Sequence, residues 1–274
     1  MSNPENFDIY SIFDSHFHII DKRFPLLTNN GFLPDEFTCN AYLERTKSFK
    51  LIGGAVISAS FQGFDQTYLK DALHKLGPDF VGVTQLPASV SDEEIIELDV
   101  IGVRAIRFNV VRGGSESIDH LETLAKRIND IAGWHVELYI DSSGLSDLFD
   151  IISRLPSVSI DHLGLSEKGF RVLLGLVERG VRVKATGFGR VDFDIAHAIK
   201  EICQANPDSL MFGTDLPSTR APRPFCKEDL LLVAESLDEE LLQKVLYKNA
   251  ISFSRPLGIR DLKDGDWEII KDKN

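Results

Sequence analysis

Short apolar segments with the length of β-strands occur eight times along this chain of 274 residues, and a helical segment follows each one. Strand and helix alternation predicts parallel strands, because a parallel pair needs a long crossover connection. Eight such units in about 250 residues favour a closed (β/α)₈ barrel, an α/β fold. In a barrel of this type the active site lies at the carboxyl ends of the strands.

No low-complexity segment or linker interrupts the chain, so we expect one domain over residues 1–274. The expected strands occupy residues 9–20, 51–57, 80–83, 103–110, 134–140, 158–161, 181–185 and 210–212. The expected helices occupy residues 38–50, 65–76, 91–98, 119–132, 142–154, 166–178, 192–204, 227–236 and 239–252. Residues 21–37 form a long irregular stretch, and loops of this length are usually functional.

An open doubly wound sheet is the alternative arrangement of these elements. A dinucleotide-binding sheet of that kind has the pattern G-x-G-x-x-G after its first strand. The chain lacks this pattern, because Gly187-Phe188-Gly189 has no third glycine. We therefore interpret these glycines as a turn and favour the closed barrel.

The composition limits the partners and the compartment. A formal net charge of −12 argues against nucleic acid, because phosphate binding needs clustered Lys and Arg. Cys39, Cys203 and Cys226 have no C-x-x-C spacing, which argues against a disulfide framework and favours a cytoplasmic location. No signal peptide pattern is present and no apolar run approaches the ~20 residues that span a bilayer, so we expect no membrane partner. The sequence is compatible with a homo-oligomer.

The first expected strand carries unusual polar residues, in the run Asp14-Ser15-His16-Phe17-His18. Alternate side chains share a face in a strand, so we expect Asp14, His16 and His18 in a row on one side. Such a row costs free energy in an apolar core unless its members find partners. Hydrogen-bonded core histidines are one explanation, but the complete row favours a functional site.

Further polar residues lie at the expected strand ends. They are Arg107, Asn109 and Arg112 at the fourth strand, Glu137, Tyr139 and Asp141 on the fifth, Asp161 or His162 after the sixth, Lys184 and Arg190 at the seventh, and Asp215 after the eighth. A lysine in an apolar strand, such as Lys184, must find a counter-charge. Structural explanations exist for some of the others: Arg104 can be a barrel-end charge, Asp161 can cap a helix, and His135 can lie at the opposite end of the barrel.

His16, His18, a further histidine and Asp215 form a suitable ligand set for one divalent metal, and nitrogen and oxygen ligands suit zinc. A metal there would lower the pKa of bound water and polarise a carbonyl. The same residues can also act without a metal. Asp215 would then activate water as a general base, and the histidines would polarise the carbonyl or stabilise the oxyanion.

Six segments occur in one characteristic order and span nearly the whole chain. They are Asp14-Ser15-His16-Phe17-His18, Gly102-Val103-Arg104-Ala105-Ile106-Arg107-Phe108-Asn109, Trp134-His135-Val136-Glu137-Leu138, Asp161-His162-Leu163-Gly164, Lys184-Ala185-Thr186-Gly187 and Phe212-Gly213-Thr214-Asp215-Leu216-Pro217. In this order they resemble the amidohydrolase superfamily, in the branch that contains 2-pyrone-4,6-dicarboxylate lactonase and sugar lactonases. The late Tyr247-Lys248-Asn249-Ala250 is similar to the closing helix of that family.

The resemblance implies a barrel hydrolase that opens a lactone or a similar cyclic ester by attack of water. By position, Asp215 matches the catalytic aspartate of the family, and His162 matches its strand-six histidine. His16 and His18 match its strand-one pair. In the dicarboxylate lactonase, arginines after strand four bind substrate carboxylates, and Arg107 and Arg112 stand at their positions. The planar guanidinium suits this role because it pairs with a carboxylate through two hydrogen bonds.

Some features depart from the broader superfamily. No strand-four lysine or glutamate is present to bridge two metals, which argues against a binuclear centre, and the lactonase branch includes members that act without metal. Where the family often has Trp-Pro-His after the aspartate, this chain has Leu216-Pro217-Ser218. Together with the loop Arg220-Ala221-Pro222-Arg223-Pro224, this change predicts an altered substrate pocket.

We therefore expect a hydrolase that opens a lactone of a small, carboxylate-bearing substrate. The expected catalytic residues are Asp215, His16, His18 and His162, and the expected substrate-binding residues are Arg107, Arg112, Lys184, Tyr139 and Arg190. Either one divalent metal, zinc by ligand type, binds at His16, His18 and Asp215, or the reaction proceeds without metal. The alternatives are a metal-dependent decarboxylase of the same branch and a non-catalytic ligand-binding barrel.

Overall fold

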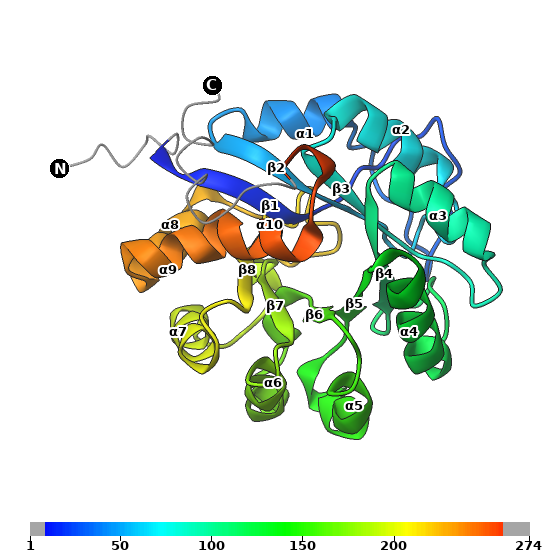
Figure 1. Cartoon of the computed structure of the whole chain (residues 1–274). Coiled ribbons are helices and arrows are strands. Elements are labelled where there is room, and N and C mark those ends of the chain that lie inside the picture. Colours follow the sequence, from blue (N-terminus) through cyan, green and yellow to red (C-terminus); the bar gives the residue numbers. More distant parts are fainter. Residues whose placement is uncertain (1–8, 260–274) are drawn as a thin grey trace.

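The computed structural model describes residues 9–259, and eight strands within this range pair in chain order, each parallel to the next. The strands are β1 (Ser11–Phe17), β2 (Lys50–Ile57), β3 (Phe80–Thr84), β4 (Val103–Asn109), β5 (His135–Tyr139), β6 (Val158–Ile160), β7 (Arg182–Ala185) and β8 (Leu210–Phe212). The helices are α1 (Cys39–Thr46), α2 (Thr67–Leu76), α3 (Asp92–Val100), α4 (Leu121–Ala132), α5 (Leu145–Ile152), α6 (Phe170–Val177), α7 (Ile195–Ala205), α8 (Lys227–Ser236), α9 (Glu239–Gln243) and α10 (Asn249–Ser254). The helices surround the strands (Figure 1), which is the expected (β/α)₈ barrel.

The segment after β8 closes the ring against β1. The backbone N–H of Asp215 donates to the carbonyl of His16, and the N–H of His18 donates to the carbonyl of Leu216, both at 2.7 Å. The carboxylate of Asp14 adds two bonds across the same seam, from the backbone N–H and the hydroxyl of Thr214 at 2.8 and 2.6 Å. Closure therefore places the polar end of β1 beside Asp215.

Apolar side chains fill the layer between strands and helices and cover the amino end of the barrel. Phe17 stacks on Tyr42 of α1 with their ring centroids 3.7 Å apart. Helix α10 crosses in front of the strands in Figure 1, and its Phe253 ring lies 4.0 Å from the ring of His135 at the start of β5. The carboxyl ends of the strands, on the opposite side, are the ones free to form a site.

Several element boundaries differ from the sequence-based prediction, and three of the differences have a clear structural cause. Strand β1 ends before residue 20, because Ile20 instead pairs antiparallel with Phe37 and so joins the two ends of the 21–37 loop. Helix α1 is shorter than expected, because β2 already begins at Lys50. The single helix predicted over 239–252 is divided by a π-helical turn, Lys244–Lys248, between α9 and α10.

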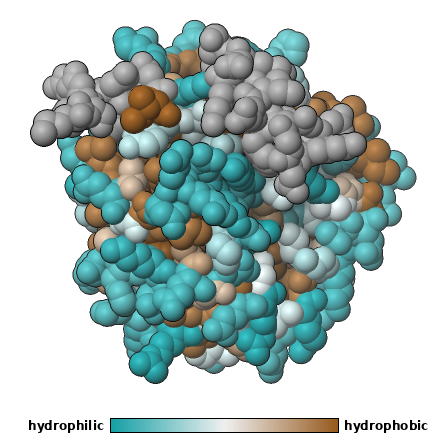
Figure 2. Space-filling view, turned by 60° about the vertical axis from the view of Figure 1, so that its left-hand side comes forward, coloured by the Kyte–Doolittle hydropathy of each residue, from teal (hydrophilic) through white to brown (hydrophobic). Residues whose placement is uncertain are grey.

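On the face shown in Figure 2, hydrophilic side chains cover most of the described part and apolar side chains form separate patches between them. None of the helices within residues 9–259 is long and apolar enough to cross a membrane.

Candidate active site

A pocket of about 340 Å³ opens at the carboxyl ends of the strands, where the sequence predicted the active site. The lining residues come from β1, β4, β5 and the loops around them, and they are His18, Ala59, Ser60, Phe61, Arg107, Asn109, Arg112, Tyr139, His162, Arg190, Thr219 and Arg220. Four arginines and only a few apolar side chains in this lining favour a polar, anionic ligand.

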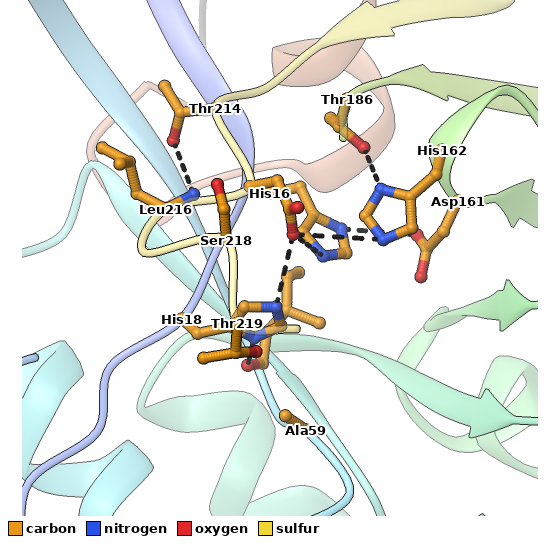
Figure 3. A network of polar contacts seen from close by, with 12 residues as sticks. His16, His18, Ala59, Asp161, His162, Thr186, Thr214, Leu216, Ser218 and Thr219 are labelled. Carbon is orange, nitrogen blue, oxygen red and sulfur yellow. Dashed lines mark hydrogen bonds and ion pairs between the residues drawn. The ribbon is translucent and has the colours of Figure 1, made fainter. Parts of the chain in front are cut away.

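The structure brings together the four residues predicted to be catalytic. The Nε2 atoms of His16, His18 and His162 lie 3.9, 3.7 and 4.0 Å from one oxygen, Oδ1 of Asp215. Figure 3 shows the three imidazoles converging on one point. These separations are too long for hydrogen bonds. The space between His16, His18 and Asp215 therefore suits an ion or a water molecule that contacts these three residues.

The Nδ1 atoms of the same histidines face partners outside the cluster. His18 Nδ1 lies 2.8 Å from the carbonyl of Ile57, which can only accept, so this nitrogen carries the hydrogen. His162 Nδ1 lies 2.7 Å from the hydroxyl of Thr186. Figure 3 marks this contact with a dashed line. His16 Nδ1 lies 3.4 Å from Asp161 Oδ1, which favours the same tautomer. The Nε2 lone pairs of His16 and His18 therefore point toward the carboxylate.

This arrangement fits one metal ion. His16 Nε2 and Asp215 Oδ1 are buried and have no hydrogen-bond partner in the described chain. A tetrahedral zinc site with bonds of ~2.0–2.2 Å separates its ligands by about 3.3–3.6 Å, close to the distances found here. Histidines whose Nδ1 is held by a carbonyl or a carboxylate are also typical of metal sites. His16, His18 and Asp215 can therefore hold a single cation.

A second cluster, His16, Asp161 and His162, has the spacing of a metal site, but positively charged side chains lie next to its carboxylate. The Nε and NH2 atoms of Arg107 donate to Asp161 Oδ2 at 3.1 and 2.8 Å. Lys184 Nζ lies 4.0 Å from the other oxygen. Arg107 already balances this carboxylate and Lys184 adds a second positive charge nearby, so the structure does not favour a second metal.

Asp14 is not part of the catalytic cluster, and the prediction that it shares a face with His16 and His18 is wrong. The pairing register of β1 shifts between Asp14 and Phe17, and such an irregularity turns side chains away from strict alternation. Asp14 instead accepts hydrogen bonds from Thr214 and from Tyr42 at the barrel seam. Burial raises the pKa of Asp14 to about 6 against the lowering effect of these bonds.

The sequence left open whether Asp161 or His162 faces the interior, and the structure places both there. His162 has a φ of +52°, and the left-handed conformation continues through Leu163 and Gly164. This bend directs two consecutive side chains into the barrel. Gly187 gives His162 its room, because a Cβ at Gly187 would lie only 2.6 Å from His162 Nδ1.

The charges of the cluster follow from its surroundings. Burial lowers the pKa of His162 to about 3 and the pKa of His16 well below its usual value, so both imidazoles are neutral at pH 7. Burial alone would raise the pKa of Asp215, but His162 and Arg190 outweigh it and hold this pKa below its usual value. Arg190 Nε donates to Asp215 Oδ2 at 2.8 Å, and Arg190 NH2 forms an ion pair with the same oxygen at 2.8 Å. Asp215 is therefore ionised and leaves Oδ1 toward the histidines.

The predicted substrate-binding residues occupy three different environments. Arg107 and Arg190 line the pocket but are already paired with Asp161 and Asp215. Lys184 lies deeper and donates to Glu137 at 2.6 Å, which supplies the counter-charge its position required. Tyr139 and Arg112 line the pocket, with the Arg107 guanidinium 5.1 Å from the Tyr139 ring centroid.

The remaining candidates have structural partners. Arg104 is fully buried and donates to the carboxylate of Asp99 at 2.7 Å, away from the pocket. His135 lies at the amino end of β5, opposite the pocket, as the structural explanation in the sequence analysis proposed. Its Nε2 lies 3.3 Å from Glu137 Oε1. Arg220 lines the pocket but was not predicted as a binding residue. The sequence did carry a signal for it, because the loop that begins at Arg220 departs from the family pattern and predicted an altered substrate pocket.

A parallel barrel with histidines and an ionised aspartate at the carboxyl ends of its strands belongs to the class of barrel hydrolases that activate water. Comparison with known families agrees. The family model described as Amidohydrolase matches residues 13–253, and the chain belongs to this family. The resemblance expected from six segments is thereby confirmed, and the protein is a hydrolase.

Relatives named for specific reactions align along most of the chain. A 2-pyrone-4,6-dicarboxylate hydrolase of Comamonas testosteroni is 25% identical, over 89% of this chain and 90% of the relative. A 4-sulfomuconolactone hydrolase of Rhizobium radiobacter is 24% identical, over 74% of this chain and 75% of the relative.

Solved structures share the fold. A probable 2-pyrone-4,6-dicarboxylic acid hydrolase of Acinetobacter baumannii, with citric acid bound, superposes with a TM-score of 0.77 at 18% identity, covering 89% of this chain and 99% of the other. A Pseudomonas putida protein named for the same activity has a TM-score of 0.75 at 24% identity, covering 92% of this chain and 98% of the other.

Proposed function

We propose that the protein hydrolyses a lactone, or a related cyclic ester, of a small substrate that carries carboxylate or sulfonate groups. One observation supports this most: the ionised Asp215 presents a free oxygen to three histidine Nε2 atoms, next to a pocket lined by four arginines. The two relatives act, by their names, on lactones with anionic substituents. A citric acid molecule in the Acinetobacter structure shows that a polycarboxylate binds that related barrel.

In the proposed reaction Asp215 takes a proton from a water molecule, whose oxygen attacks the lactone carbonyl carbon. A C–O bond forms, the carbonyl oxygen becomes an oxyanion, and the ring C–O bond then breaks. Asp215 returns the proton to the leaving oxygen, so the product is the ring-opened acid. The water that is attacked by the base lies next to Asp215 Oδ1 in this proposal, and Arg107 and Arg190 lie where they can orient the ring.

A divalent ion such as zinc, held by His16, His18 and Asp215, would lower the pKa of water and polarise the carbonyl. His162 lies beside this set, with its Nδ1 held by Thr186. This placement agrees with the free Nε2 lone pairs of the cluster. The chain would in either case act as one barrel domain in the cytoplasm.

The metal capacity is expected to be at most one zinc ion per chain. Arg107 balances the charge of Asp161 and Lys184 lies near it, so a second ion has no unbalanced carboxylate to bind. Equilibrium dialysis with zinc, followed by elemental analysis, measures the ratio. His18→Gln should lower binding, whereas His120→Gln, at an exposed histidine, should not. A second tightly bound equivalent would contradict the proposed charge balance.

Arg190→Gln is expected to shift the acid limb of the kcat/KM profile to higher pH. Arg190 favours the ionised form of Asp215, so its loss raises the pKa of Asp215. A protonated Asp215 cannot accept a proton, and activity then falls earlier as the pH is lowered. Arg223→Gln is the control, because Arg223 pairs with Asp229 outside the pocket. If the acid limb of the kcat/KM profile were unchanged in Arg190→Gln, the ion pair with Arg190 would not control the ionisation of Asp215.

The proposed function is tested with a panel of pyrone carboxylates, muconolactones and sugar lactones. We expect ring opening of at least one anionic lactone and slower turnover of neutral sugar lactones. Release of carbon dioxide from a carboxylated substrate would instead favour the decarboxylase alternative. Tight binding of panel compounds without turnover would favour a binding barrel.

A further inference from the structure

The four arginines of the pocket fall into two pairs. Arg107 and Arg190 each donate to a buried carboxylate. Arg112 and Arg220 are half-buried, and no carboxylate within residues 9–259 lies at ion-pair distance from either of them. The positive charge available to a ligand therefore comes from Arg112 and Arg220 rather than from the two paired arginines.

Arg220 is held in place by the loop over residues 21–37. Its NH1 donates to the side-chain oxygen of Asn29 at 2.9 Å, and its NH2 donates to the Asn29 carbonyl at 3.0 Å. The guanidinium also lies over the ring of Phe32, 4.3 Å from the centroid. Asn29 and Phe32 themselves exchange backbone hydrogen bonds at 3.0 Å, which forms a tight turn. The head group of Arg220 is thus fixed before a ligand arrives.

Asn29 joins the two arginine-bearing loops. Its Nδ2 donates to the carbonyl of Arg112 at 3.1 Å, while its oxygens accept from Arg220. The loop after β4 and the loop after β8 are therefore tied together by a single amide side chain. This tie brings two like charges to one side of the pocket, and partial burial and the nearby Arg112 lower the pKa of Arg220. Such an arrangement is relieved by an anion.

We propose that Arg220, together with Arg112, binds a second anionic group of the substrate, remote from the carbonyl that is attacked, and that Asn29 is the positioning residue of this subsite. The inference rests on the proposed function for the position of the carbonyl beside Asp215. The ligand class is a lactone with a carboxylate or sulfonate on the side opposite the scissile ester. Arginine recognises either group through paired, charge-assisted hydrogen bonds.

The test compares pyrone dicarboxylate with the two pyrone monocarboxylates in steady-state kinetics. Arg220→Gln should raise KM for the dicarboxylate by about tenfold to hundredfold and leave kcat nearly unchanged, because a charge-assisted contact is lost. KM for the monocarboxylate that lacks the remote group should change little. Arg220→Lys should restore part of the effect. Asn29→Asp should also raise KM, because its carboxylate would neutralise Arg220.

Arg223→Gln is the matched control, since Arg223 lies in the same loop but pairs with Asp229. It should leave every KM unchanged. The subsite would be overturned if Arg220→Gln changed KM equally for the dicarboxylate and both monocarboxylates, or if it lowered kcat alone.

Binding of pyridine-2,4-dicarboxylate, which lacks an ester, separates this inference from the proposed function. Titration calorimetry should show that Arg220→Gln weakens this binding by at least about tenfold. If the wild type binds it through Arg220 but opens no lactone, the subsite stands and the hydrolase assignment falls. If lactones are opened and Arg220→Gln binds and reacts like the wild type, the function stands and the subsite falls. Neither binding nor turnover in the wild type would overturn both.

Discussion

Asp215→Asn is expected to lower kcat for lactone opening by about 10²–10⁴-fold, the range attributed to a positioned general base. The amide keeps the shape of the side chain but cannot take a proton from water. Oδ1 is the oxygen that matters, because Oδ2 already accepts from Arg190. KM should change much less than kcat, because the arginines that face the substrate remain in place.

The matched control for Asp215→Asn is Asp229→Asn. Asp229 is also buried and paired with an arginine, Arg223, but it lies at the start of α8. Its replacement should cost some stability and leave kcat unchanged. Circular dichroism establishes that both variants fold. Equal kcat values for Asp215→Asn and the wild type would remove Asp215 from the mechanism.

Glu137→Gln is expected to lower the free energy of unfolding by about 3–5 kcal/mol, because it leaves Lys184 as a buried charge without its partner. Lys184 donates to Glu137 at 2.6 Å, and both side chains are 2% exposed. The next carboxylate oxygen, Asp161 Oδ1, lies 4.0 Å away and already faces His16, and Oδ2 of the same carboxylate pairs with Arg107. Denaturant unfolding followed by circular dichroism measures the loss.

The double variant Glu137→Gln/Lys184→Met isolates the cause. Removing both charges should recover most of the lost stability, since neither charge is then buried alone. Lys126→Met is the surface comparison, because Lys126 forms an exposed pair with Glu122 at 2.7 Å. It should cost no more than about 1 kcal/mol. A double variant less stable than Glu137→Gln would show that Lys184 has another structural role.

The barrel and the centre of the site were accessible from the sequence because their signals are local. Strand and helix segments have the expected order. Position at strand ends was enough to bring His16, His18 and Asp215 together, and the family resemblance added His162. The same local rule failed for Asp14. Alternation assumes a regular strand, whereas β1 shifts its register there.

The sequence could not predict which arginines pair with a carboxylate, because pairing depends on distances between remote segments. Arg107, Arg190 and Arg220 are alike in sequence, yet the first two are neutralised by aspartates and the third is not. The partner of Arg220 is Asn29, from the opposite end of the chain. The left-handed conformation of His162 likewise depends on tertiary structure. It places the side chains of both alternative candidates, Asp161 and His162, in the barrel interior.

The most direct test of the account is the reaction of a pyrone dicarboxylate in water labelled with ¹⁸O, followed by mass spectrometry of the product. Attack of water next to Asp215 predicts a product heavier than the substrate by one molecule of labelled water, with the label in the new carboxylate. It also predicts that this product is nearly absent with Asp215→Asn. Loss of carbon dioxide without incorporation of label, or the same labelled product at equal rates from both proteins, would contradict the account.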